Sequence, residues 1–364
     1  MRSVCWAVAR NLTAAVVFVL LLAGLQAGTV SHYLATATPA PTPAPSPAPR
    51  PAPAPNPEAA KQEVTVGVYV ENVQAVDLTT NSFSADFYVW LRWRDPDIDA
   101  PAGIEVMNVF EAWALTTTEL YEEPRKQPDG SLVWLVRYQG EFNSPLSVAD
   151  YPFQKQTLRF VFEEAIYGAK RVVYVPDKDP ITVNPDITLA GYNFGQPRIA
   201  FDTHTYPTSF GDVGSSAEDR TYTRVVVEIP VSSPMTSGIF KTILPLLIVL
   251  VAAALGVIIP ASYVDSKVNV PITALIALVA MQFGVSSALP EVGYLPMIDL
   301  IYFLGYAAVT AMLAGAVIGA WKLRHDGEDD AMILERRFTL WICIAFVVSF
   351  VAVLLFYLLP GALL

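Results

Sequence analysis

The side chains that could do chemistry in this sequence are acids and aromatics, and they do not form the pattern of a catalytic centre. The three histidines, His32, His204 and His325, are too far apart in the sequence to suggest a histidine metal site. A glycine-rich phosphate loop and a G-x-S-x-G nucleophile motif are both absent. The two cysteines, Cys5 and Cys343, lie near the two ends, so the segment between them holds no disulfide. We therefore expect no enzyme, no cofactor and no resident metal.

Acids and aromatics instead recur together in the middle of the chain, and this combination can bind cations. An aromatic face attracts a cation through its quadrupole, by roughly 0.5–2 kcal/mol. Residues 61–234 carry 14 Lys and Arg against 25 Asp and Glu, which accounts for the whole formal charge of −11. This charge excludes a nucleic-acid binder. It could concentrate cations near a pore, or it could simply keep an exported domain soluble.

The elements that must position these residues are short strands. Apolar and polar residues alternate over Ser82–Arg94, Leu132–Gln139 and Tyr222–Val231, which is typical of half-buried strands. About ten such strands over residues 61–234 predict an all-β sandwich. One short helix is expected near Asn108–Ala114.

Four apolar runs follow the strands, and each is long enough to cross a membrane, which takes about 20 residues. We expect helices at about 239–262, 267–289, 297–322 and 336–359, within a pore domain at 235–364. The chain as a whole is 53% hydrophobic and only 16% charged, which excludes an ordinary soluble protein.

Basic residues in the short loops predict the orientation of these helices. Lys267 lies in the first turn, and the third loop, of about fifteen residues, contains Lys322, Arg324, Arg336 and Arg337. The second loop contains none. We expect the basic loops in the cytoplasm, with the β-domain and the C-terminus outside the membrane.

The N-terminal 60 residues are expected to lie outside both domains. Residues 1–37 combine arginines, an apolar run and small residues, which predicts a secretory signal peptide. A retained fifth helix is the alternative. Residues 38–60 alternate proline with small residues and predict an extended stalk.

A β-sandwich followed by four closely spaced helices resembles the prokaryotic pentameric ligand-gated ion channels, bacterial relatives of the Cys-loop receptors. Four local matches carry the resemblance. In the β-domain, Tyr88–Pro96 with Trp93 and Asp95 is similar to the second-strand motif of the family, and Tyr151–Gln156 is similar to its Cys-loop signature. In the helices, Pro245 is similar to the first-helix proline, and Leu289-Pro290 with Tyr294 and Asp299 is similar to the linker between the second and third helices. Gly327–Asp330 and Arg336-Arg337 also resemble one amine-gated bacterial subgroup. Gln154 departs from the signature, which has Asp there.

The resemblance implies a homopentamer in the inner membrane of a bacterium, which binds its agonist between subunits of the outer domain. The positions that match the family's aromatic and acidic cage are Tyr88, Trp90, Glu111, Trp113, Arg137, Glu163, Glu164, Tyr167, Tyr192, Phe194, Tyr206 and Phe210. These side chains favour a small agonist of the primary-amine class, although Ala165 stands where the amine-gated relative has an aromatic. Gating by protons is the alternative, because His204 and the Glu163-Glu164 pair could titrate.

The second helix is expected to line the pore, and a lining helix exposes one face at helical spacing. The expected lining residues are Asp265, Asn269, Thr273, Ile276, Ala280, Phe283 and Ser287. Rings of Ile276 and Phe283 could close the pore by dewetting, or these could be ordinary membrane residues. A ring of Asp265 predicts selectivity for monovalent cations, although Lys267 could offset it and an anion channel is the alternative.

The same resemblance assigns coupling between ligand and pore to residues near the membrane surface. These residues are Tyr151, Pro152, Phe153, Pro245, Pro290 and Tyr294. A membrane-anchored solute sensor without a current is the competing interpretation. The short third loop argues against such a sensor, because it leaves no room for a cytoplasmic output module.

Overall fold

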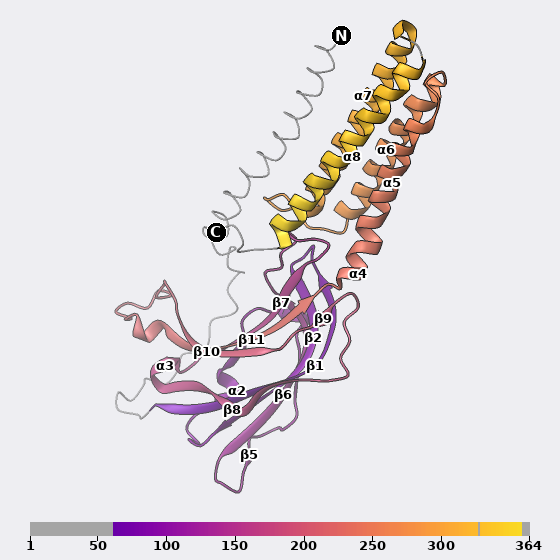
Figure 1. Ribbon diagram of the computed structural model, residues 1–364. Helices are drawn as coiled ribbons and strands as arrows, with labels where there is room; N and C mark the ends of the chain where they lie inside the picture. The colour runs from indigo at the N-terminus through magenta and orange to yellow at the C-terminus, as the bar shows by residue number, and fades with distance from the viewer. Residues whose placement is uncertain (1–60, 327, 359–364) are drawn as a thin grey trace. The chain divides into compact units, whose positions relative to one another are not determined.

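The structure is a computed structural model that describes residues 61–326 and 328–358 (Figure 1). The described residues divide into two compact units. The β unit contains residues 61–146 and 155–232, and the helix unit contains residues 147–154 and 233–358. The expected signal peptide at 1–37 and stalk at 38–60 lie outside the described residues.

The β unit is a sandwich of two sheets, which confirms the predicted fold class. One sheet has the order β4-β6-β2-β1-β8 with β5 paired to β6, and the other has the order β10-β11-β7-β3 with β9 paired to β11. The strands are β1 Gln62–Asp77, β2 Ser82–Trp93, β3 Ile104–Val106, β4 Thr116–Glu119, β5 Arg125–Lys126, β6 Leu132–Asn143, β7 Lys155–Glu164, β8 Val172–Val183, β9 Asn193–Phe194, β10 Arg198–Thr205 and β11 Thr221–Ser232.

The alternation of the sequence explains how the two sheets meet. Phe83 and Phe87 of β2, Phe142 of β6 and Phe160 of β7 are at most 1% exposed. Their rings lie 4.4–5.8 Å apart in tilted or edge-on pairs, the arrangement that the ring quadrupole favours. The core therefore consists of the apolar half of each alternating strand, and the polar half faces outward.

The short helix expected near Asn108–Ala114 is largely absent. Only the single 3-10 turn η1, Ala112–Ala114, is helical there. The preceding residues pair with β6 instead, because the backbone N–H of Phe110 donates to the carbonyl of Glu141 at 2.8 Å. Pairing with the sheet edge thus replaces the expected helix. Three further short helices are α2 Ala100–Gly103, α3 Gly168–Arg171 and the 3-10 turn η2 Glu218–Arg220.

The helix unit has four helices that are long and apolar enough to span a membrane. The first, Met235–Ile258, consists of α4 Met235–Gly238, the π-helical turn η3 Ile239–Ile243, α5 Leu244–Leu255 and the 3-10 turn η4 Gly256–Ile258. The other three are α6 Val264–Ser286, α7 Met297–Asp326 and α8 Glu328–Leu358. The π-helical turn comes directly before Pro245, which lacks the N–H that would bond one turn back.

The third loop, expected to span about fifteen residues, is replaced by helix. α7 continues to Asp326 and α8 begins at Glu328, rather than at 336. The reason lies in the charges at both helix ends. Glu328, Asp329 and Asp330 occupy the first turn of α8, and α7 ends with basic Arg324 and His325. Each sign is stabilised there by the helix dipole, so a polar segment remains helical.

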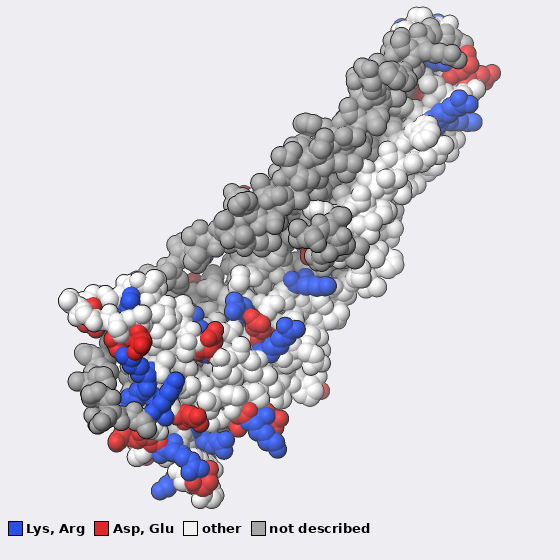
Figure 2. Space-filling model, turned by 60° about the vertical axis from the view of Figure 1, so that its left-hand side comes forward, with Lys and Arg blue, Asp and Glu red and all other residues white. Residues whose placement is uncertain are grey.

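Charged side chains are distributed differently over the two units. Figure 2 shows blue and red residues interspersed on the visible face of the β unit. On the helix unit they gather at the end that holds the α5–α6 turn and the α7–α8 junction, while most of the intervening visible surface is uncharged. An uncharged band between polar ends is the surface expected of helices in a bilayer.

Candidate functional site

The helix α6 and its C-cap residue Ser287 present one exposed face that contains all seven of the predicted pore-lining residues. Asp265, Asn269, Thr273, Ile276, Ala280, Phe283 and Ser287 are all exposed in the single chain. Ile276 is 65% exposed and Phe283 is 73% exposed, which is unusual for large apolar side chains. Their exposure in one chain means that water, lipid or another chain must cover them.

The opposite face of α6 packs against the rest of the helix unit. Its buried residues are Lys267, Pro271, Ala274 and Leu278. Lys267 forms an ion pair with Glu335 of α8, and both side chains are about 4% exposed. Further along, Gln282 of α6 accepts a hydrogen bond from the Tyr306 hydroxyl of α7 at 2.6 Å. Polar contacts thus fix α6 near both of its ends.

In the β unit, the predicted ligand residues Glu163 and Tyr206 lie together. The Tyr206 hydroxyl donates to Glu163 Oε1 at 2.6 Å, and Arg224 Nη2 of β11 lies 2.5 Å from Glu163 Oε2. Glu163 is 2% exposed. Burial and the neighbouring Glu163 raise the pKa of Tyr206. The Glu163 carboxylate therefore already has a cationic partner, which sequence reasoning did not name.

Aromatic rings surround Tyr206. The centroid of its ring lies 4.7 Å from that of His204, 5.2 Å from that of Phe210 and 5.8 Å from that of Tyr222, all in edge-on geometry. Phe210 is 72% exposed, so this cluster has an open side. Burial, followed by the nearby Arg224 guanidinium, lowers the pKa of His204. His204 is therefore held toward its neutral form.

Glu164 is the second predicted acid, and its surroundings differ from those of Glu163. Its carboxylate accepts the backbone N–H groups of Ile166, Tyr167 and Gly168 at 2.7–3.1 Å. Burial nevertheless raises the pKa of Glu164 to about 7. A Cβ at Gly103 would lie 2.4 Å from Glu164 Oε1, so only glycine leaves space for the carboxyl there. Glu164 thus titrates near neutral pH while it organises the turn after β7.

A separate group of predicted residues lies on the other sheet. Arg137 of β6 makes a two-point contact with Asp86 of β2, from Nε at 2.8 Å and from Nη2 at 2.5 Å. Its guanidinium also lies 5.3 Å from the centre of the Tyr88 ring. Trp90 donates from Nε1 to Asp177 Oδ2 of β8 at 2.7 Å. Asp86 and Asp177 are acids that sequence reasoning missed, although Asp86 occupies the polar face of an alternating strand.

The remaining predicted ligand residues are placed differently. Glu111 and Trp113 lie at the turn η1 and are exposed, with Trp113 at 84%. Tyr192 and Phe194 are half-buried and pack against the sandwich core. Tyr167 accepts the backbone N–H of Asp99 on its hydroxyl at 3.0 Å. Solvent-facing aromatic surface is therefore concentrated at Trp113 and Phe210.

The segment Ser147–Gln154, which contains three predicted coupling residues, packs within the helix unit. Phe153 is 8% exposed and belongs to the helix core, and Tyr151 packs against that core. The backbone N–H of Val148 donates to the Tyr294 hydroxyl at 3.1 Å, and that of Met297 donates to the Ala149 carbonyl at 2.8 Å. This segment therefore contacts the connection from α6 to α7. Pro290 lies in the same connection, and Pro152 is buried beside Gly238 of α4.

Comparison with known proteins gives the same assignment as the motifs. The chain is 25% identical to a proton-gated ion channel of Gloeobacter violaceus over 269 residues, which cover 68% of this chain and 72% of that protein. It is 19% identical to the gamma-aminobutyric acid receptor subunit alpha-2 of Bos taurus and to that of Homo sapiens, over 76% of this chain and 64% of each receptor subunit. No family model matches the chain.

The local motifs, the fold and these relatives together support a prokaryotic pentameric ligand-gated ion channel. The predicted family is thereby confirmed, and so is the expectation that the protein is not an enzyme, because its relatives are ligand-gated ion channels. With its four membrane-length helices, the channel is a multi-pass membrane protein.

Proposed function

We propose that this channel is a homopentamer in the inner membrane of a bacterium and that it conducts monovalent cations. The observation that carries the proposal is the exposed face of α6. A helix that buries Ala274 and Leu278 against its own chain, and exposes polar residues at helical spacing, is suited to line a water-filled pore. The lining residues would be those from Asp265 to Ser287 named above.

Cation selectivity is supported by the charges on this face. Asp265 is exposed in the first turn of α6, and Lys267 is buried away from solvent. A ring of carboxylates at a pore mouth attracts cations and repels anions. Asn269 and Thr273 follow on the same exposed face and could replace part of the hydration shell of the ion. The basic residues at this end of the helices support its placement in the cytoplasm.

The test of cation selectivity is the reversal potential of Asp265→Asn in asymmetric sodium chloride. We expect the cation preference to fall about tenfold, because the variant removes a charge from each subunit at the mouth. Asn269→Ala is the matched control on the same face, since it removes polarity without charge. An unchanged reversal potential in Asp265→Asn would remove Asp265 from the selectivity filter.

Protons are the opening stimulus that we propose first. Glu164 supports this proposal because its carboxyl is buried, its pKa is about 7, and it holds three backbone N–H groups of the turn after β7. Protonation removes the buried charge and weakens those charge-assisted hydrogen bonds, so it changes how the turn is held. The Gloeobacter relative is a proton-gated ion channel, which points to the same stimulus.

Current recorded in liposomes or oocytes between pH 8 and pH 4 tests proton gating. We expect activation near pH 7 or below in the wild-type channel. Glu164→Gln should lose most of this pH dependence, because an amide cannot titrate in that range. Glu63→Gln, a change at an exposed acid of β1, should leave the pH dependence unaltered. A current that is independent of pH would refute the proposal.

A small primary amine remains the second candidate agonist, and the cluster around Tyr206 favours it. The cluster combines three aromatic neighbours with the acid Glu163, and its ring Phe210 is open to solvent. A panel of amines at pH 8 tests this candidate, because Glu164 is then ionised. We expect Phe210→Ala to weaken any amine response by roughly fivefold, in line with the loss of one cation–π contact. Absence of a response to every amine would leave protons as the stimulus.

A further inference from the structure

The buried pair Lys267–Glu335 lies beside the exposed carboxylate that we propose as the selectivity filter. Lys267 follows Asp265 by two residues on the continuous helix α6. At about 100° per residue, the two side chains leave the helix on opposite sides. Asp265 is exposed and Lys267 is 4% exposed, which agrees with this geometry. The ammonium of Lys267, which is the positive charge nearest to Asp265 along the chain, therefore points into the helix unit.

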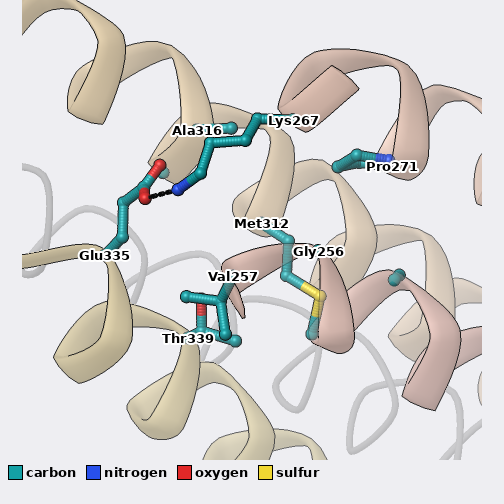
Figure 3. Close-up of a pocket in the computed structure, with 10 residues that line it drawn as sticks. Gly256, Val257, Lys267, Pro271, Met312, Ala316, Glu335 and Thr339 are labelled. Carbon is teal, nitrogen blue, oxygen red and sulfur yellow. Dashed lines mark hydrogen bonds and ion pairs between the residues drawn. The ribbon is translucent and has the colours of Figure 1, made fainter. Parts of the chain in front are cut away.

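Glu335 of α8 forms an ion pair with the ammonium of Lys267. Figure 3 shows the ammonium of Lys267 and the carboxylate of Glu335 pointing toward one another, joined by an ion pair. Both side chains are buried, with exposures of 4% and 5%. A small cavity of about 20 Å³ adjoins them, and among its lining residues only these two are charged. No other described residue of that cavity could neutralise the lysine.

Two glycines of α7 leave space for the side chain of Glu335. A Cβ at Gly319 would lie 2.5 Å from Glu335 Oε1 and 2.6 Å from its Cδ. One turn earlier, a Cβ at Gly315 would lie 2.8 Å from Cδ1 of Phe338. Two glycines four residues apart thus form a groove in α7 where α8 lies close, a known way for membrane helices to approach. The carboxylate reaches Lys267 because this groove lacks side chains.

We propose that Glu335 is a positioning residue for ion selection: it holds the ammonium of Lys267 away from the pore, so that the Asp265 carboxylate acts there without a counter-charge. The inference rests on the proposed cation selectivity. Without Glu335, Lys267 is an unpaired buried cation, which is unfavourable in a helix bundle. The flexible lysine side chain can then turn toward the exposed end of α6 that holds Asp265. Its ammonium then adds a positive charge per subunit beside the acidic ring.

The first test measures reversal potentials in asymmetric sodium chloride for Glu335→Gln. We expect the sodium-to-chloride permeability ratio to fall by about fivefold as Lys267 turns toward the mouth. The double variant Lys267→Gln, Glu335→Gln should restore the wild-type ratio, because it removes the freed charge. Asp330→Asn, an exposed carboxylate in the first turn of the same helix, is the matched control and should leave the ratio unchanged. A ratio that is unaltered in Glu335→Gln overturns the inference, and so does a ratio that stays low in the double variant.

The second test does not depend on current. The full-length channel is acetylated with a water-soluble N-hydroxysuccinimide ester, and peptides are quantified by mass spectrometry. In the wild type, we expect Lys267 to react at least about tenfold more slowly than exposed Lys126 of β5. In Glu335→Gln, Lys267 should become reactive. Equal reactivity of Lys267 and Lys126 in the wild type overturns the inference even if a variant fails to assemble.

The two proposals fail in different ways. If Asp265→Asn changes the permeability ratio and Glu335→Gln does not, the cation filter stands and the role of Glu335 is refuted. If Asp265→Asn has no effect while Lys267 is protected from acetylation, the filter is wrong, and so is the role of Glu335 in ion selection.

Discussion

Glu164 is expected to make the stability of the β unit depend on pH. Burial raises its pKa in the folded state to about 7, from an ordinary value of 4.5. The folded protein therefore binds the proton more tightly than the unfolded chain does. The associated stability, about 3 kcal/mol, is fully present below pH 4.5 and is lost as the pH rises through 7.

Glu164→Gln should remove this dependence. We expect the thermal midpoint of the wild-type channel to fall between pH 5 and pH 7.5 relative to that of the variant, as followed by tryptophan fluorescence in detergent. The exposed variant Glu63→Gln supplies the comparison. Parallel midpoints for wild type and Glu164→Gln across this range would mean that the carboxyl does not titrate there.

The contacts of Glu163 show which part of the candidate ligand site could be predicted from the sequence. Glu163 and Tyr206 were predicted as ligand residues, and the structure brings them within hydrogen-bond distance. Arg224, 61 residues after Glu163, was not predicted to neutralise it. Residue types indicate that an acid is available, but the register of β11 against β7 decides which base faces it, and that register is not visible in the alternation alone.

Among the helices, the contact between α7 and α8 depends on the glycine groove. Gly319→Ala would place a methyl group 2.5 Å from Glu335 Oε1, which forces α8 outward or displaces the ion pair. We expect a loss of about 1–3 kcal/mol of stability, the usual range for overpacking. It is measured as a lower thermal midpoint in detergent. Gly305→Ala on the same helix is the control, because its Cβ would meet the nearest atom at an ordinary 3.6 Å.

The helices themselves were easier to predict than their ends. A run of about 20 apolar residues is a sufficient signal for a membrane helix. The ends of α7 and α8 were misplaced because residues 324–330 are polar, and the segment from 323 to 335 was therefore interpreted as a loop. Their acids and bases are in fact arranged to favour helix termini at Asp326 and Glu328. Glu335 therefore lies on a helix, where it can meet Lys267.

At the scale of the whole molecule, the sequence indicated the order of a β-sandwich and a helix bundle because their periodicities differ, two for strands and 3.6 for helices. The family resemblance also predicted that Tyr151, Pro152 and Phe153 act on the connection after α6, which contains Pro290 and Tyr294. Sequence alone could not indicate that Ser147–Gln154 packs in the compact unit of the helices. That association depends on contacts such as the one from Val148 to Tyr294, 146 residues apart.

Assembly should make the exposed apolar residues of α6 act collectively. Ile276 and Phe283 are 65% and 73% exposed in one chain, and in the proposed pentamer each forms a ring around the pore. A narrow apolar ring excludes water and blocks ions, whereas a polar ring stays wet.

We expect Phe283→Ser or Ile276→Ser to raise the resting sodium flux into liposomes by about tenfold at pH 8, without a stimulus. Ile344→Ser on α8, 44% exposed but on a helix that is not proposed to line the pore, should leave this flux at its wild-type level. A resting flux that does not change in either α6 variant would mean that the closed pore is blocked elsewhere along the helix.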